Sequence, residues 1–132
     1  MPGAIPDDDT VRPKAGELLP RAAEAIGVRY KLATYSLDIA HQDGGPKARG
    51  FRLILGITIE TIDHLEAQIV ARILETPITD VRDNAPYGFN CVIDMHIRGI
   101  GTKASRLANV RTVWAFDRPD APPRLVNAYP KP

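Results

Sequence analysis

The chain has 132 residues, which is enough for one domain with its own apolar core. Its single cysteine, Cys91, excludes an internal disulfide and has no zinc-type spacing to a histidine, so we expect no metal and no cofactor. The N-terminus lacks a signal-peptide pattern, and no segment approaches the roughly 20 apolar residues of a membrane span. We therefore expect a cytoplasmic protein without membrane contact.

The net charge of +1 is unevenly distributed along the chain. Residues 57–95 carry two basic and seven acidic side chains, whereas residues 96–132 carry seven basic and two acidic ones. This pattern predicts a basic face in the C-terminal half that could attract an anion. A solvated surface of mixed charge is the alternative.

The N-terminal half has a helical pattern. Residues 1–16 contain three prolines and an acidic triplet, so we expect a flexible leader, followed by a single folded domain over residues 17–132. Apolar spacing predicts a helix over residues 17–26, a short and mainly helical stretch over 30–40, and a helix over 47–55.

The strongest helical signal runs from Thr61 to Glu75. A threonine can cap its start, and Pro77 lies just past its end. We expect this segment to be the core helix. Its predicted apolar stripe consists of Ile62, Leu65, Ile69, Val70, Ile73 and Leu74.

The apolar period changes to two in the C-terminal half. Strict alternation predicts a strand over residues 89–98, with Phe89, Cys91, Ile93, Met95 and Ile97 facing the core helix. Further strands are expected over 109–117 and 124–129, with a weaker edge strand over 78–82. Helices followed by a strand meander indicate an α+β fold, with N-terminal helices packed on a three- to four-stranded antiparallel sheet.

Several short motifs resemble a family of uncharacterised small bacterial domains. The resemblance covers residues 22–130, but Gln42 stands where proline is common, and Asn127 replaces the usual threonine of the last strand. The matching residues are Lys31, Leu32 and Tyr35; His41, Gly44, Lys47, Ala48 and Phe51; Tyr87 and Gly88; and Val110, Thr112, Trp114 and Pro123 to Pro130.

The element order of that family is similar to the metal-independent ribonuclease toxins grouped with barnase, the tRNase colicins and RelE. The resemblance implies a toxin-like endoribonuclease with RNA as substrate and a small antitoxin-like partner protein. Two rival functions stay open. One is a non-catalytic interaction module such as an antitoxin, immunity or adaptor protein, and the other is a small-molecule-binding protein that uses the Trp114 sheet as a pocket wall.

RNA cleavage without a metal needs a base, an acid and cations around the reacting phosphate. We expect His41 or His96 to transfer protons and Lys47 and Arg111 to stabilise negative charge. If the last two strands pair without a bulge, the side chains that could hold the phosphate share one face of the sheet. These side chains are Thr112, Asn127 and Tyr129.

Three further residues are candidates for substrate binding. Lys103 and Arg106 lie in a Gly-rich loop where they could steer phosphate, although such cations can serve solubility alone. Trp114 could stack on a base, but a single Trp on an apolar strand face is more often part of the core.

Overall fold

The computed structural model describes residues 12–84, 86 and 88–131. Three helices, α2 (Val28–Lys31), α3 (Gly45–Leu55) and α4 (Ile62–Arg72), precede a four-stranded antiparallel sheet. The strands are β1 (Asp80–Asp83), β2 (Phe89–Arg98), β3 (Leu107–Phe116) and β4 (Pro123–Pro130), and they neighbour one another in chain order. This arrangement confirms the predicted α+β meander.

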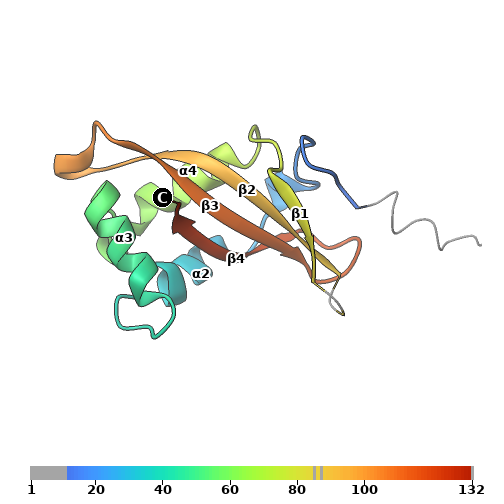
Figure 1. The fold of residues 1–132 in the computed structure, drawn as a ribbon, viewed down its shortest axis with the longest axis horizontal. Coiled ribbons are helices and arrows are strands. Elements are labelled where there is room, and N and C mark those ends of the chain that lie inside the picture. The colour runs from blue at the N-terminus through green and yellow to red at the C-terminus, as the bar shows by residue number, and fades with distance from the viewer. Residues whose placement is uncertain (1–11, 85, 87, 132) are drawn as a thin grey trace, which may run out of the picture.

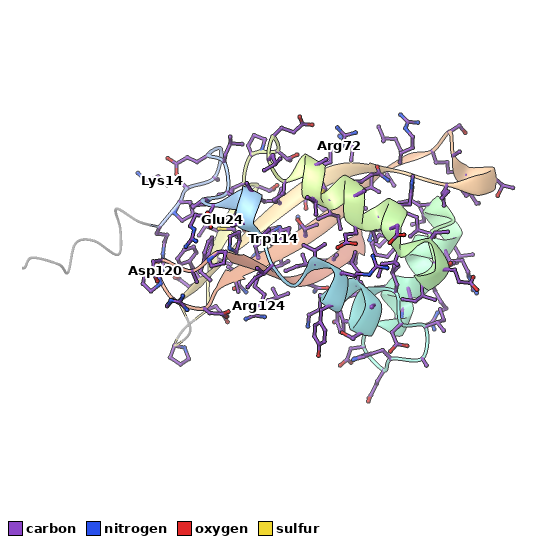
Figure 2. The ribbon with its side chains drawn as sticks, turned by 180° about the vertical axis from the view of Figure 1, so that it is seen from behind. Lys14, Glu24, Arg72, Trp114, Asp120 and Arg124 are labelled. Atoms are coloured by element: carbon purple, nitrogen blue, oxygen red, sulfur yellow. The ribbon has the colours of Figure 1, made fainter. Side chains whose placement is uncertain are left out.

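The helices cover one face of the sheet and leave the other open. The strands lie in front of α4 in Figure 1, whereas α2 and α4 lie in front of the strands when the molecule is seen from behind in Figure 2. Helix α3 packs beside the end of β4, where Gly50 lies against Pro130. The loop that precedes α3 therefore lies close to the last strand.

The burial of alternate side chains in β2 explains why apolar and polar residues alternate in its sequence. Cys91, Ile93, Met95 and Ile97 are at most 2% exposed and belong to the core, whereas His96 is exposed on the open face. The core also contains Leu65 and Ile69 of α4. The predicted register is thus confirmed, because a period of two places every second side chain against the helices.

The N-terminal segment differs from the prediction. Instead of a helix over residues 17–26, the chain forms a short 3₁₀ turn, Ala22–Glu24, and then pairs with β4. The Ile26 amide donates to the Pro123 carbonyl oxygen at 2.9 Å, and the Leu125 amide donates to Ile26. The predicted helix is wrong because these sheet contacts satisfy the backbone groups that a helix would use internally.

The boundary of the predicted leader also changes. The amide of Gly16 donates to the carbonyl oxygen of Ile78, and the Ile78 amide donates back to Glu17, both at 2.8 Å. Arg12 pairs with Asp83 of β1. Residues 12–16 therefore belong to the folded domain rather than to a leader, and residues 1–11 lie outside the described residues.

Helix α4 is shorter than the predicted span and has a narrower apolar stripe. Ile62, Leu65, Ile69 and Ile73 are buried, but Val70 and Leu74 are 47% and 48% exposed. The sheet contacts only one side of the helix, so apolar residues at the margin of the stripe stay in solvent. Among the described residues, no helix is both long enough and apolar enough to cross a membrane.

Candidate functional site

Two segments that are distant in sequence meet where α3 packs beside β4. The Lys47 ammonium donates a hydrogen bond to the Tyr35 hydroxyl and lies 4.4 Å from the Tyr35 ring centroid. It also lies 5.5 Å from the ring centroid of Tyr129 on β4. We use the name edge cluster for the residues gathered there, which are Tyr35, His41, Lys47, Asp94, Arg111, Tyr129 and Lys131.

Backbone geometry fixes Tyr35 in the edge cluster. Tyr35 lies in a π-helical turn, Leu32–Ser36, that follows α2 directly. Gly44 packs so closely on this turn that a Cβ there would overlap the Tyr35 carbonyl group. The rings of Tyr35 and His41 then meet edge-on, with centroids 5.0 Å apart and planes at 80°. A π-helical turn is rare and often marks a functional position.

The backbone also determines how His41 is protonated. Its Nδ1 atom accepts hydrogen bonds from the amides of Asp43 and Gly44, each at 3.0 Å. An accepting Nδ1 has no proton, so the neutral ring carries its proton on Nε2. His41 is thus arranged to donate a hydrogen bond through Nε2. The sequence leaves both acid and base open for His41, and the role of base would require both backbone contacts to break.

Arg111 is held by a carboxylate on the neighbouring strand. Its Nε and Nη2 atoms donate to the two oxygens of Asp94 at 2.8 and 3.0 Å. Hydrogen bonding from Arg111 lowers the pKa of Asp94 below its usual value, and Lys131 acts in the same direction. Asp94 in turn raises the pKa of Arg111, and the nearby Tyr129 hydroxyl adds to that effect. Arg111 is therefore a fixed cation beside Tyr129, its neighbour on the next strand.

A bulge in the sheet separates residues that the sequence placed together. The register between β3 and β4 shifts at Val113 and Trp114, so that Thr112 pairs with Ala128. Tyr129 pairs with Arg111 instead, and Asn127 pairs with Val113. Paired residues share a face. Asn127 and Tyr129 therefore lie on the open face, whereas Thr112 lies on the core face, and the predicted phosphate-holding trio does not form.

Thr112 and Trp114 belong to the core, which corrects both predicted roles. Each is 0% exposed. The Thr112 hydroxyl donates to the Ile93 carbonyl oxygen and accepts from Trp114 Nε1, both at 2.8 Å. Trp114 has no free ring face for a base, and Thr112 has no hydroxyl proton left for a phosphate.

The remaining predicted residues lie outside the edge cluster. His96 is exposed on the open face, two positions along β2 from Asp94. Lys103 and Arg106 lie in the β2–β3 connection, which contacts the C-terminal end of α3 through a bond from the Ile100 amide to Leu55. Lys47 lies at the other end of α3, which is about 16 Å long. These two cations therefore do not join Lys47.

Sequence reasoning missed three members of the edge cluster. In the sequence, Tyr35 is only a motif residue of the family that the chain resembles, and a short helical stretch gives no sign of its contact with Lys47. Asp94 and Lys131 come together because Lys131 Nζ reaches Asp94 Oδ2 at 3.2 Å, across 37 residues of sequence. The alternating polar residues of β2 were the signal for Asp94, but the same pattern is typical of any solvated sheet face.

The chain matches one protein family over almost all of the folded domain. A model described as a domain of unknown function, DUF6883, matches residues 18–132. The chain belongs to the DUF6883 family. No curated protein and no solved structure matches the chain. All seven members of the edge cluster lie within the matched DUF6883 region.

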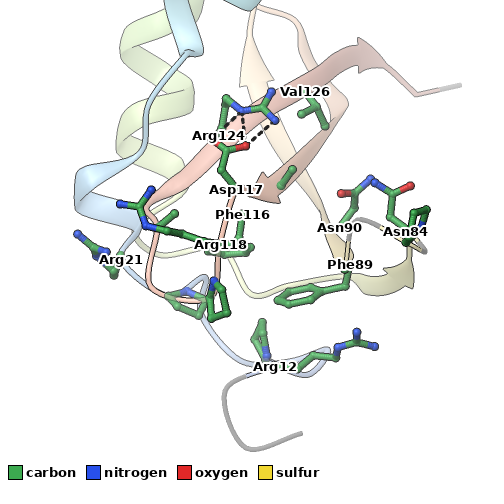
Figure 3. Close-up of a pocket in the computed structure, with 17 residues that line it drawn as sticks. Arg12, Arg21, Asn84, Phe89, Asn90, Phe116, Asp117, Arg118, Arg124 and Val126 are labelled. Carbon is green, nitrogen blue, oxygen red and sulfur yellow. Dashed lines mark hydrogen bonds and ion pairs between the residues drawn. The ribbon is translucent and has the colours of Figure 1, made fainter. Parts of the chain in front are cut away.

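The DUF6883 domain also has a cavity at the other end of its sheet. This cavity of about 700 Å³ lies where the β1–β2 and β3–β4 turns meet the N-terminal segment. Its wall includes Phe89 and Phe116 together with several arginines, as Figure 3 shows. None of the candidate site residues predicted from the sequence lines it. Among the described residues, no three His, Cys, Asp or Glu side chains gather as metal ligands.

Proposed function

We propose that this domain is a metal-independent endoribonuclease whose active site is the edge cluster. The observation that supports the proposal best is the contact of Lys47 with both Tyr35 and Tyr129. Cleavage by the neighbouring 2′-hydroxyl needs groups that transfer protons beside a cation that stabilises the phosphorane. Two phenols around one ammonium, with His41 alongside, provide such groups.

The proposed reaction is an in-line transesterification. The 2′-oxygen forms a bond to phosphorus, the bond from phosphorus to the 5′-oxygen breaks, and a 2′,3′-cyclic phosphate remains. A base takes the proton of the 2′-hydroxyl, and an acid returns one to the leaving 5′-oxygen. We assign one of these transfers to Tyr129, because its hydroxyl can give and take a proton and its ring lies near Lys47 on the strand position paired with Arg111.

The other members of the edge cluster have supporting roles in this proposal. Lys47 faces the charge that develops on the phosphate oxygens. His41 donates a hydrogen bond through Nε2 to a phosphate oxygen, consistent with its tautomer. Arg111 adds positive charge beside Tyr129 rather than binding the phosphate, since Asp94 already occupies two of its donors. His96 stays a candidate for the second proton transfer because it shares the open face with Asp94.

Cleavage of a labelled RNA in EDTA tests the proposal. We expect the wild-type protein to leave 2′,3′-cyclic phosphate ends. The variants Lys47→Ala and Tyr129→Phe should each lose about two to three decades in rate, equivalent to roughly 3–4 kcal/mol of transition-state stabilisation. Tyr30→Phe is the matched control, because Tyr30 is 71% exposed on α2. Equal rates for Tyr129→Phe and Tyr30→Phe would remove Tyr129 from the mechanism.

The toxin-like role is tested in cells. Expression of the wild-type domain should arrest growth, and a small protein encoded next to it should relieve the arrest. Lys47→Ala should be tolerated without the partner. If wild-type protein neither cleaves total RNA nor slows growth, the enzyme hypothesis fails.

A non-catalytic interaction module is the alternative function. The capture of Arg111 by Asp94 favours it, because a bidentate pair consumes donors that a phosphate would otherwise use. The departure at Asn127 points the same way, since an amide cannot act as a hydroxyl acid. This module would bind the same partner with Lys47→Ala as with the wild-type protein, and neither would cleave RNA.

A further inference from the structure

We infer that the cavity at the turn end of the sheet binds one nucleotide of a single-stranded RNA. The base would lie on the aromatic wall, and the phosphate would meet the arginines of the rim. The inference rests on the proposed function, because it extends the RNA from the edge cluster along the sheet to its opposite end. We call this cavity the turn pocket.

The turn pocket has a stacking wall. The rings of Phe89 and Phe116 lie 5.4 Å apart with their planes at 34°, and both rings line the cavity. The guanidinium of Arg12 lies 4.8 Å from the Phe89 ring centroid. Aromatic rings and arginine planes are the side chains on which unpaired bases stack. The wall therefore suits a planar ring better than it suits an aliphatic chain.

The turn pocket is rich in cations. Among the described residues that line it are four arginines, namely Arg12, Arg21, Arg118 and Arg124, and one carboxylate, Asp117. Figure 3 shows Arg21 and Arg118 on one side of the cavity and Arg12 below it. Each of these arginines forms an ion pair with a carboxylate, and the most exposed of the four pairs is that of Arg118 with Asp120, at 68% and 82%. Such an exposed pair is weak, so a phosphate can replace the carboxylate at little cost.

An amide lies at the rim of the turn pocket, next to Phe89 on β2 but on the other face of the sheet. Asn90 lines the cavity, and its Oδ1 atom is buried and accepts no hydrogen bond from the described residues. The side chain of Asn84 lies next to it in Figure 3. A buried acceptor without a partner is costly, and the edge of a base supplies N–H donors that could satisfy it once the Asn90 side chain turns its Oδ1 atom toward the cavity. An inorganic anion supplies none.

The open face of the sheet joins the turn pocket to the edge cluster. Asn90 and Asp94 point to the same face of β2 and are four residues apart, which corresponds to about 13 Å. On β3, Ala115 of the pocket and Arg111 of the edge cluster are also four residues apart and point to the same face. An extended RNA strand of a few nucleotides on the open face would therefore run from Arg111 to Asn90 at the end of the sheet. There its last nucleotide would have to turn over the end of the sheet to reach Phe89 and Phe116, which point to the other face.

Binding of a non-cleavable RNA tests the inference. The probe is a labelled single-stranded oligonucleotide with 2′-O-methyl riboses, which lacks the attacking hydroxyl, and affinity is measured by fluorescence anisotropy with the full chain. We expect Phe116→Leu and Arg118→Ala each to weaken binding by roughly tenfold. Arg118→Ala should also reduce the dependence of log affinity on log salt by about one unit.

Arg72→Ala is the matched control for Arg118→Ala. Arg72 is a surface arginine on α4 with one local carboxylate partner, Glu75, and it lies on the helical side of the molecule in Figure 2. Its loss should leave affinity within about twofold of wild type. Wild-type affinity in both Phe116→Leu and Arg118→Ala would overturn the inference, as would displacement of the probe by inorganic phosphate as effectively as by uridine monophosphate.

Failure of the inference and failure of the proposed function can be told apart. If the wild-type protein cleaves RNA and the Phe116→Leu and Arg118→Ala variants have an unchanged KM, the turn pocket is not a nucleotide site. The proposed ribonuclease activity would then stand. Loss of probe binding in those variants, in a protein that cleaves no RNA, would keep the turn pocket as an RNA site and overturn the ribonuclease.

Discussion

Asp94 of β2 and Arg111 of β3 stand opposite one another in the sheet and are joined by two hydrogen bonds of 2.8 and 3.0 Å. Their side chains are only 12% and 16% exposed. A bidentate pair at this depth fixes the guanidinium in orientation as well as in position. Because Tyr129 lies beside Arg111 on the next strand, the pair anchors the sheet side of the edge cluster.

Replacement of Asp94 should lower stability and remove one pH dependence. The pKa of Asp94 is lowered in the folded state, so the carboxylate stabilises the fold above its unfolded pKa of about 3.9. This contribution is lost as the pH falls through the folded pKa. We expect Asp94→Asn to unfold about 1–3 kcal/mol more easily at pH 7. Between about pH 5 and pH 2, where the Asp94 carboxylate titrates, the urea midpoint of Asp94→Asn should fall less than that of the wild-type protein.

Replacement of Gly44 by alanine should destabilise the domain, whereas the same replacement at Gly50 should not. A Cβ on Gly44 would overlap the Tyr35 backbone, which cannot move without disturbing the π-helical turn. A Cβ on Gly50 would lie at an ordinary 3.6 Å from Pro130. We expect Gly44→Ala to lower the melting temperature and abolish RNA cleavage. Gly50→Ala should gain about 0.5–1 kcal/mol, because alanine favours a helix. A more stable Gly44→Ala protein would contradict the packing described for the loop.

The hydroxyl of Thr112 should matter for stability rather than for chemistry. Thr112→Val keeps the shape but leaves Trp114 Nε1 and the Ile93 carbonyl oxygen without this partner. We expect a loss of about 1–3 kcal/mol in urea unfolding followed by Trp fluorescence. Thr112→Ser, which keeps the hydroxyl, should retain most of the stability. A large fall in kcat for Thr112→Val, measured where the protein is fully folded, would return Thr112 to the candidate site.

Cys91 should react with thiol reagents only through unfolding. Burial raises the pKa of its thiol to about 12. The side chain is also 0% exposed, so at pH 8 little thiolate forms and no reagent reaches it. Labelling by a disulfide reagent should therefore proceed at the rate at which the domain opens and should become fast in urea. Fast labelling of the native protein would show that the core under β2 opens far more often than this packing allows.

The sequence predicted the elements whose pattern has a single physical explanation. The alternation of β2 could be read directly, because each inward residue meets the helices. Trp114 and Thr112 could not be assigned, since the same alternation fits a core face and a binding face. The bulge at Val113 and Trp114 changes which β4 side chains face the core, and no residue type in that stretch indicates a bulge. Contacts between distant segments, such as Lys47 with Tyr129, depend on how α3 meets β4 and have no local pattern.

The edges of the sheet limit how a partner protein can bind this domain. Ile26 occupies the outer side of β4 near Pro123, and α3 packs beside its far end. At the other edge, β1 spans four residues, three of which are charged. Short and charged edges disfavour pairing with a foreign strand. A partner that recognises the folded domain would thus bind side chains around the helices or on the open face, and only on the open face would it compete with the RNA proposed to lie on the sheet.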